Sequence, residues 1–238
     1  MDYNAIQFAA ITFARKNRKK IARKYTDINK YRPDKFPVSV FMAGSPGAGK
    51  IEFSKNIISI LEKNKDHQVV RVDGDEIRHE LPGYTGNNSY LFQGAISLVV
   101  EKIHDSVLAQ KQSFVLDGTL SKYEKAAHNI KRSLDKGRQV FVFYVYQHPL
   151  TAWNFTKKRE AVEGRNIPKE SFIDQFLGAR DTINSIRENF DGTVTIFLVK
   201  KDFEKNTVET VVEIKPHFLP IDEYIKERYT KDELNNML

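Results

Sequence analysis

Val38–Lys50 reads VSVFMAGSPGAGK, a short apolar run followed directly by a glycine-rich segment. The run Val38–Ala43 is too short for a helix and stops at a glycine, which favours a buried strand. Gly44–Lys50 then matches the pattern G-x-x-x-x-G-K, and apolar residues follow it at helical spacing, namely Phe53, Ile57, Ile58 and Leu61. A strand, a glycine-rich loop and a helix in this order predict a phosphate-binding loop rather than a chance glycine-rich turn.

The glycines of this loop let successive backbone N–H groups turn toward a polyphosphate, and the following helix adds the positive end of its dipole. Lys50 is expected to reach the β- and γ-phosphates. The predicted nucleotide-binding residues are Gly44, Ser45, Pro46, Gly47, Ala48, Gly49, Lys50 and Ile51.

Ile51 departs from the pattern of such loops. The residue after the lysine is usually Ser or Thr, whose hydroxyl ligates Mg²⁺. Isoleucine has no oxygen, and its branched side chain would point toward the metal. The sequence therefore predicts a nucleotide site that is weakened or disabled at its metal.

Composition is that of a soluble globular protein, with 40% hydrophobic and 29% charged residues. No apolar run approaches the ~20 residues needed to span a bilayer, and the basic N-terminus has no apolar signal segment. The chain has no cysteine, which excludes disulfides and thiolate metal sites. These features favour a cytoplasmic protein without a membrane partner.

Positive charge gathers at the N-terminus. Residues 1–36 contain ten Lys and Arg but three Asp and Glu, whereas residues 37–238 contain 28 of each sign. We predict a basic helical arm and linker over 1–36, with the helix over 2–24 and its apolar residues packed on the main domain. The cluster Arg15–Lys20 has no interleaved aromatic residue, so a solvated helix face is favoured over nucleic acid or acidic lipid binding.

Strands and helices alternate beyond the loop, which predicts an α/β fold. About five strands should form a parallel sheet covered by helices on both faces, with ligands at the carboxyl ends of the strands. After the first strand, the further strands are expected over 68–72, 113–116, 140–146 and 193–200. The helices between them are expected over 89–110, 122–136, 150–160 and 169–190. The end of the chain should add a polar segment over 202–206, an extended stretch over 207–214, a helix over 221–228 and a short helix capped by Thr230.

Carboxylates follow two of the predicted strands, and parallel strands bring such ends to one edge. Asp117 either holds Mg²⁺ or caps a helix, and the spacing does not separate the two roles. One of Asp73 and Asp75 is a candidate to orient an acceptor hydroxyl and take its proton, while the other caps a helix starting at Glu76. The alternative is that both are turn residues.

Arg159 and Arg165 flank Gly164 in a charged stretch typical of a mobile lid. Arginines that close over phosphates would stabilise the charge of a transferring group. The alternative is a solvated helix and turn.

Several ordered motifs resemble the zeta toxin family, P-loop kinases of bacterial toxin–antitoxin modules. The resemblance covers about residues 36–204 and rests on Val70–Arg78 (VRVDGDEIR), Leu81–Gly86 (LPGYTG), Leu116–Thr119 (LDGT) and Trp153–Lys169, which contains FTKKREAVEGRNIPK.

The resemblance implies a kinase domain over 37–238 that uses ATP or GTP with Mg²⁺ to phosphorylate the sugar 3′-hydroxyl of UDP-N-acetylglucosamine. It also implies an antitoxin partner. By this resemblance Asp75 is the catalytic base, Lys50 is the loop lysine, and Arg159 and Arg165 contact the phosphates. The implied substrate-binding residues are Asp73, Glu101, Asp117 and Thr119, with Asp117 also the metal ligand.

Three further hypotheses stay open. Ile51 is hypothesised to be an inactivating change, which would leave a catalytically dead nucleotide-binding module. Another metabolite, or a nucleic-acid end, is an alternative acceptor. The N-terminal arm is hypothesised to cover the nucleotide site of its own chain.

Overall fold

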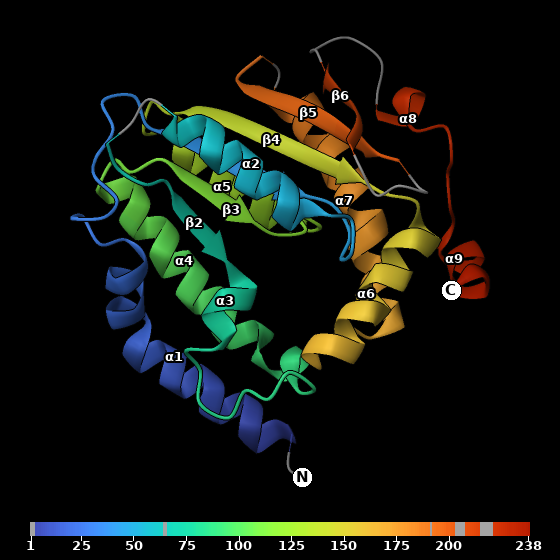
Figure 1. The fold of residues 1–238 in the computed structure, drawn as a ribbon, viewed down its shortest axis with the longest axis horizontal. Coiled ribbons are helices and arrows are strands. Elements are labelled where there is room, and N and C mark those ends of the chain that lie inside the picture. The colour runs from blue at the N-terminus through green and yellow to red at the C-terminus, as the bar shows by residue number, and fades with distance from the viewer. Residues whose placement is uncertain (1–2, 64–65, 191, 203–207, 215–220) are drawn as a thin grey trace.

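A mixed sheet forms the centre of the computed structural model, which describes residues 3–63, 66–190, 192–202, 208–214 and 221–238. Within these residues the sheet has six strands in the order β2-β3-β1-β4-β5-β6 (Figure 1). The strands are β1 (Val38–Ala43), β2 (Val70–Asp73), β3 (Phe114–Asp117), β4 (Gln139–Tyr146), β5 (Val194–Lys201) and β6 (Val208–Ile214). The first five are parallel, as predicted.

Strand β6 pairs with β5 in the antiparallel direction and adds an edge beyond the five expected strands. Only residues 202–207 connect the two strands, and a parallel crossover needs about a dozen residues or more. The short connection therefore explains the change of direction. The predicted polar segment lies outside the described residues from 203 onward, as does Thr207.

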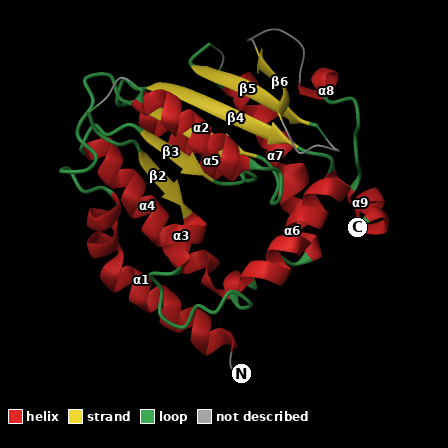
Figure 2. Ribbon diagram, viewed as in Figure 1, coloured by secondary structure: helices red, strands yellow, loops and turns green. Residues whose placement is uncertain are grey.

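Helices cover both faces of the sheet (Figure 2). The helical elements are α1 (Tyr3–Tyr25), α2 (Lys50–Glu62), α3 (Gly74–Arg78), the 3₁₀ turn η1 (Ser89–Phe92), α4 (Gln93–Ala109), α5 (Tyr123–Leu134), α6 (Pro149–Glu163), α7 (Lys169–Asn189), α8 (Ile221–Tyr224) and α9 (Lys231–Met237). Alternate residues of β1 point to opposite faces, so Val40 and Met42 pack beneath α2 while Phe41 and Ala43 join the larger core on the other side. This arrangement buries the central strands on both faces and leaves their carboxyl ends for the site.

Helix α1 packs along the outer side of α4 (Figure 1). Its buried residues are Ala10, Ala14, Ile21 and Ala22, which confirms that the apolar face of the arm packs on the main domain. The arm lies well away from the glycine-rich loop, so this arrangement does not show the covered nucleotide site that the sequence suggested.

Two predicted helices differ from the structure. The helix expected over 89–110 is divided into η1 and α4, with Ser89 Oγ donating to the carbonyl of Asn166 at 2.8 Å. The helix expected over 221–228 ends at Tyr224, and Arg180 donates to the carbonyl oxygens of Ile225 and Glu227 in the segment that follows. Thr230 caps α9 as predicted. Across the described ranges, no helix is both long and apolar enough to span a membrane.

Candidate active site

The glycine-rich loop joins β1 to α2 and requires glycine at specific points. Gly44, Gly47 and Gly49 have φ values of 133°, 73° and 86°, in the region that favours glycine. A Cβ at Gly44 would overlap the carbonyl oxygen of Val145, and one at Gly47 would overlap that of Ala152 in α6. The loop is thus fixed against β4 on one side and α6 on the other.

Lys50 begins α2 and turns back over the loop. Its Nζ donates to the carbonyl oxygens of Gly44 at 3.0 Å and Ser45 at 2.7 Å. Burial lowers the pKa of Lys50 to about 8, although the nearby carboxylate of Asp117 opposes the shift. A bound polyphosphate would offer this ammonium group stronger acceptors than two carbonyls.

The ends of β2 and β3 bring two carboxylates together. The register of these strands places Asp73 beside Asp117. Asp73 accepts a hydrogen bond from the backbone N–H of Asp75 at 2.8 Å and caps α3, which starts at Gly74 rather than at Glu76 as predicted. Burial, followed by the charges of Asp75 and Asp117, raises the pKa of Asp73 to about 6.

Asp75 lies among three arginines. Its carboxylate pairs with Arg78 from the same helix and with Arg165, while Nη2 of Arg159 lies 3.7 Å from its Oδ2. Residues 75, 159 and 165, predicted separately as base and lid, therefore converge. The candidate base is a carboxylate in which each oxygen is paired with a guanidinium group.

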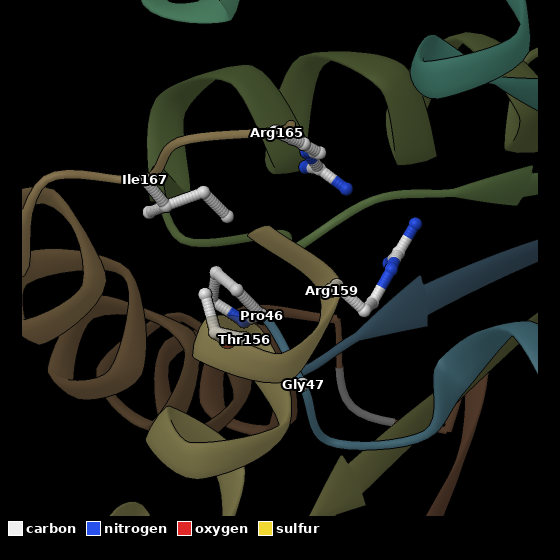
Figure 3. A pocket seen from close by; sticks show the side chains of 6 residues that line it. All are labelled: Pro46, Gly47, Thr156, Arg159, Arg165 and Ile167. Atoms are coloured by element: carbon white, nitrogen blue, oxygen red, sulfur yellow. The ribbon is translucent and has the colours of Figure 1, made fainter. Parts of the chain in front are cut away.

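A small cavity opens between the loop and this cluster (Figure 3). It is lined by Pro46, Gly47, Thr156, Arg159, Arg165 and Ile167. The side chains of Arg159 and Arg165 extend toward the same space, from the end of α6 and from the segment after it. Gly164 between them has a φ of 69° and ends α6. The two arginines thus stand opposite the phosphate-binding loop, on either side of a glycine.

Asp117 ends β3 and lies close enough to Lys50 to act on its charge. Its Oδ2 accepts from Ser54 Oγ and from Arg71 Nη2, each at 3.0 Å. Thr119 supports the loop through its backbone, since its carbonyl accepts from the N–H of Gly44 at 3.1 Å. Glu101 is exposed on α4, and in the described ranges no hydrogen bond or ion pair joins it to these residues. Its part in substrate binding remains a prediction.

Several residues of the site were not singled out from the sequence, including Arg78, which pairs with Asp75. Arg71 and Ser54 contact Asp117. Lys201 is 5% exposed at the end of β5, and a Cβ at Gly49 would lie 3.1 Å from both its Cε and its Nζ. A charged residue inside an otherwise apolar strand was the available signal for Arg71. No sequence signal pointed to Lys201, because its place beside the loop depends on the order of the strands.

Comparison with known proteins gives a family and a fold. The sequence model of the zeta toxin family matches residues 21–211. A search of curated proteins gave no match. A chain from the PezAT chromosomal toxin–antitoxin system of the human pathogen Streptococcus pneumoniae has a TM-score of 0.69 and 17% identity, over 93% of this chain and 97% of that chain.

Two further structures share the fold. A chain of the AvrRxo1-ORF1:AvrRxo1-ORF2 complex with sulphate ions has a TM-score of 0.61 and 15% identity, over 93% of this chain and 71% of that chain. The corresponding complex with ATP has a TM-score of 0.59 and 13% identity, with the same coverage. The family match spans most of the chain and includes the loop, Asp75, Asp117 and the lid arginines, so the chain belongs to the zeta toxin family.

Proposed function

We propose that this chain is a kinase that transfers the γ-phosphoryl group of ATP to a hydroxyl of a small nucleotide-linked metabolite. The observation that carries the proposal is the convergence of Asp75, Arg159 and Arg165 beside the phosphate-binding loop. A structural neighbour in complex with ATP supports the choice of donor. The family supports the sugar 3′-hydroxyl of UDP-N-acetylglucosamine as the first acceptor to test.

The residues divide the reaction between them. The loop N–H groups and Lys50 hold the phosphates, and Arg159 and Arg165 stabilise the charge of the transferring group. The acceptor oxygen attacks the γ-phosphorus, the bond from that phosphorus to the β–γ bridging oxygen breaks, and ADP leaves. Asp75 accepts the hydroxyl proton. Since Arg165 pairs with Asp75 in this structure, its guanidinium must turn toward the phosphate to free the base.

The family also implies Mg²⁺, and the donor set of this chain does not fit an ion held by the protein. Ile51 has no oxygen at the usual ligand position. The other expected ligand is Asp117, whose Oδ2 already accepts from Ser54 and from a positively charged guanidinium, so Oδ1 alone is left to a metal. The proposed chemistry therefore assigns no step to a protein-bound metal.

A second candidate is a nucleotide-binding module that does not transfer phosphate. Ile51 is the observation that favours it, because loss of the hydroxyl ligand is a route to inactivation. We further propose a protein antitoxin as partner, since the similar structures come from a toxin–antitoxin system and from a two-protein complex.

Phosphoryl transfer from γ-labelled ATP to UDP-N-acetylglucosamine tests the proposal, with ATP binding measured on the same samples by calorimetry. We expect labelled product from the wild-type chain. Product from Ile51→Thr alone would support the kinase and make Ile51 the inactivating change. Bound ATP without product from either form, across a panel of nucleotide-linked acceptors, would favour the binding module. Absence of ATP binding in both forms would overturn the proposal.

A further inference from the structure

Arg71 is the central cation of a carboxylate cluster at the ends of β2 and β3. Its Nη2 lies 2.6 Å from Asp73 Oδ2 and 3.0 Å from Asp117 Oδ2, and its Nη1 pairs with Glu76. The Arg71 side chain is 15% exposed, and that of Asp117 is 6% exposed. One guanidinium group thus joins three acids, two of them at adjacent strand ends.

The strand geometry explains this position. Alternation along β2 places Arg71 and Asp73 on the same face, and the strand register sets Asp73 beside Asp117. A guanidinium buried without partners would be strongly unfavourable, so the surrounding carboxylates fix where it lies. Arg71 is therefore held by the fold and is not a surface side chain that happens to reach the site.

Ser54 completes the contacts of Asp117 from the other side. It follows Ile51 by three residues in α2, close to one helical turn, and its side chain is buried. Its Oγ lies 3.0 Å from Asp117 Oδ2 and 3.0 Å from the carbonyl of Ile51. The hydroxyl absent at position 51 thus has a counterpart deeper in the helix, where it contacts the acid but lies farther from the loop.

We propose that Arg71 takes the place of a protein-bound divalent cation, so that this chain binds nucleoside triphosphate equally well with and without Mg²⁺. The inference rests on the proposed nucleotide site. The guanidinium of Arg71 occupies Oδ2 of Asp117, the carboxylate expected to hold the metal, and Ile51 closes the other ligand position with a side chain that has no oxygen.

Calorimetric titration of the wild-type chain with ATP, in MgCl₂ and in EDTA, tests the inference directly. We expect dissociation constants within about threefold of each other. Affinity at least about tenfold higher in Mg²⁺ would overturn the inference and leave the proposed kinase standing. A lack of binding in both buffers would overturn both.

Variants supply the converse test. Ile51→Thr combined with Arg71→Gln restores a hydroxyl and removes the guanidinium, so ATP binding should become at least about fivefold tighter in Mg²⁺. Arg132→Gln is the matched control, because Arg132 pairs with Asp105 away from the site. Its dissociation constants for ATP in MgCl₂ and in EDTA should agree, as in the wild type. A double variant that folds, as judged by circular dichroism, and shows no Mg²⁺ effect would contradict the assignment of Arg71.

Mn²⁺ titration followed by electron paramagnetic resonance gives a readout without nucleotide. The wild-type chain should leave Mn²⁺ free. Uptake by the wild type that is lost in Asp117→Asn would place a metal at Asp117 and overturn the inference, whatever the behaviour of the double variant.

Discussion

The candidate site near Lys50 has two halves that differ in what they keep. The phosphate half keeps the glycine loop, the proposed base Asp75 and two arginines that converge on it. The metal half has an isoleucine at the ligand position and a guanidinium on its remaining acid.

We interpret this difference as a change confined to the metal half. General loss of function would be expected to remove groups from both halves, yet the proposed base Asp75, Lys50 and the two arginines are all retained. The charge of the metal half has an internal replacement in Arg71. The comparison therefore predicts large effects from variants on the phosphate half and small ones on the metal half.

Arg165→Gln should have the largest effect among the variants of the lid. Loss of a preorganised cation facing the transferring group lowers the rate of phosphoryl transfer by about 10²- to 10³-fold. Initial rates at saturating ATP measure it, with Arg132→Gln as the control. A rate within threefold of the wild type would remove Arg165 from the phosphate half.

The single variants Lys50→Ala and Asp117→Asn compare the two halves through their effects on ATP binding. Loss of the charged hydrogen bonds of Lys50 should weaken ATP binding by about 10- to 100-fold. Asn at position 117 keeps an oxygen for Ser54 and Arg71, and should change the dissociation constant by less than about threefold. Equal losses from both variants would break the comparison.

The pH dependence of ATP binding should follow Lys50. Burial lowers its pKa to about 8, and the protonated form binds phosphate, so affinity falls as pH rises through this value. The dissociation constant should increase by about tenfold between pH 7 and pH 9. Calorimetry in buffers of different ionisation enthalpy should also detect proton uptake at pH 8.5. A flat profile with no proton uptake would contradict the role of burial.

Among the variants of the phosphate half, Lys201→Ala should have the smallest effect. The buried ammonium group beside Gly49 adds a partly screened positive charge near the loop, so its removal should weaken ATP binding by about two- to fivefold. Lys200→Ala, which changes the neighbouring residue of β5, is the matched control. Equal effects from the two lysines would show only a general loss of positive charge.

Sequence patterns were sufficient to predict those parts of the site that depend on residues close together in the chain. The loop, the start of α2 and the strand ends with Asp73 and Asp117 follow from apolar runs that end at glycine or aspartate. The parallel arrangement then followed from alternation of strands and helices, and it brought these ends to one edge.

Local patterns were insufficient where a distant side chain decides the outcome. Arg180 holds the segment after α8 by donating to the carbonyl oxygens of Ile225 and Glu227, a contact between distant parts of the chain. The contact of Arg71 with Asp117 depends on strand register, and that of Ser54 depends on how α2 packs across the sheet. Ile51 was visible in the sequence as a missing ligand, but its counterpart in Arg71 was visible only in three dimensions.

The most direct test of the kinase is the rate of single-turnover transfer from saturating ATP to UDP-N-acetylglucosamine, measured for the wild-type chain and for Asp75→Asn. Asparagine keeps the size of the side chain but cannot take the acceptor proton. The expected result is transfer by the wild type and a rate about 10²- to 10⁴-fold lower for the variant, with ATP binding retained. Equal rates in the two proteins would contradict the assignment of Asp75 as the base.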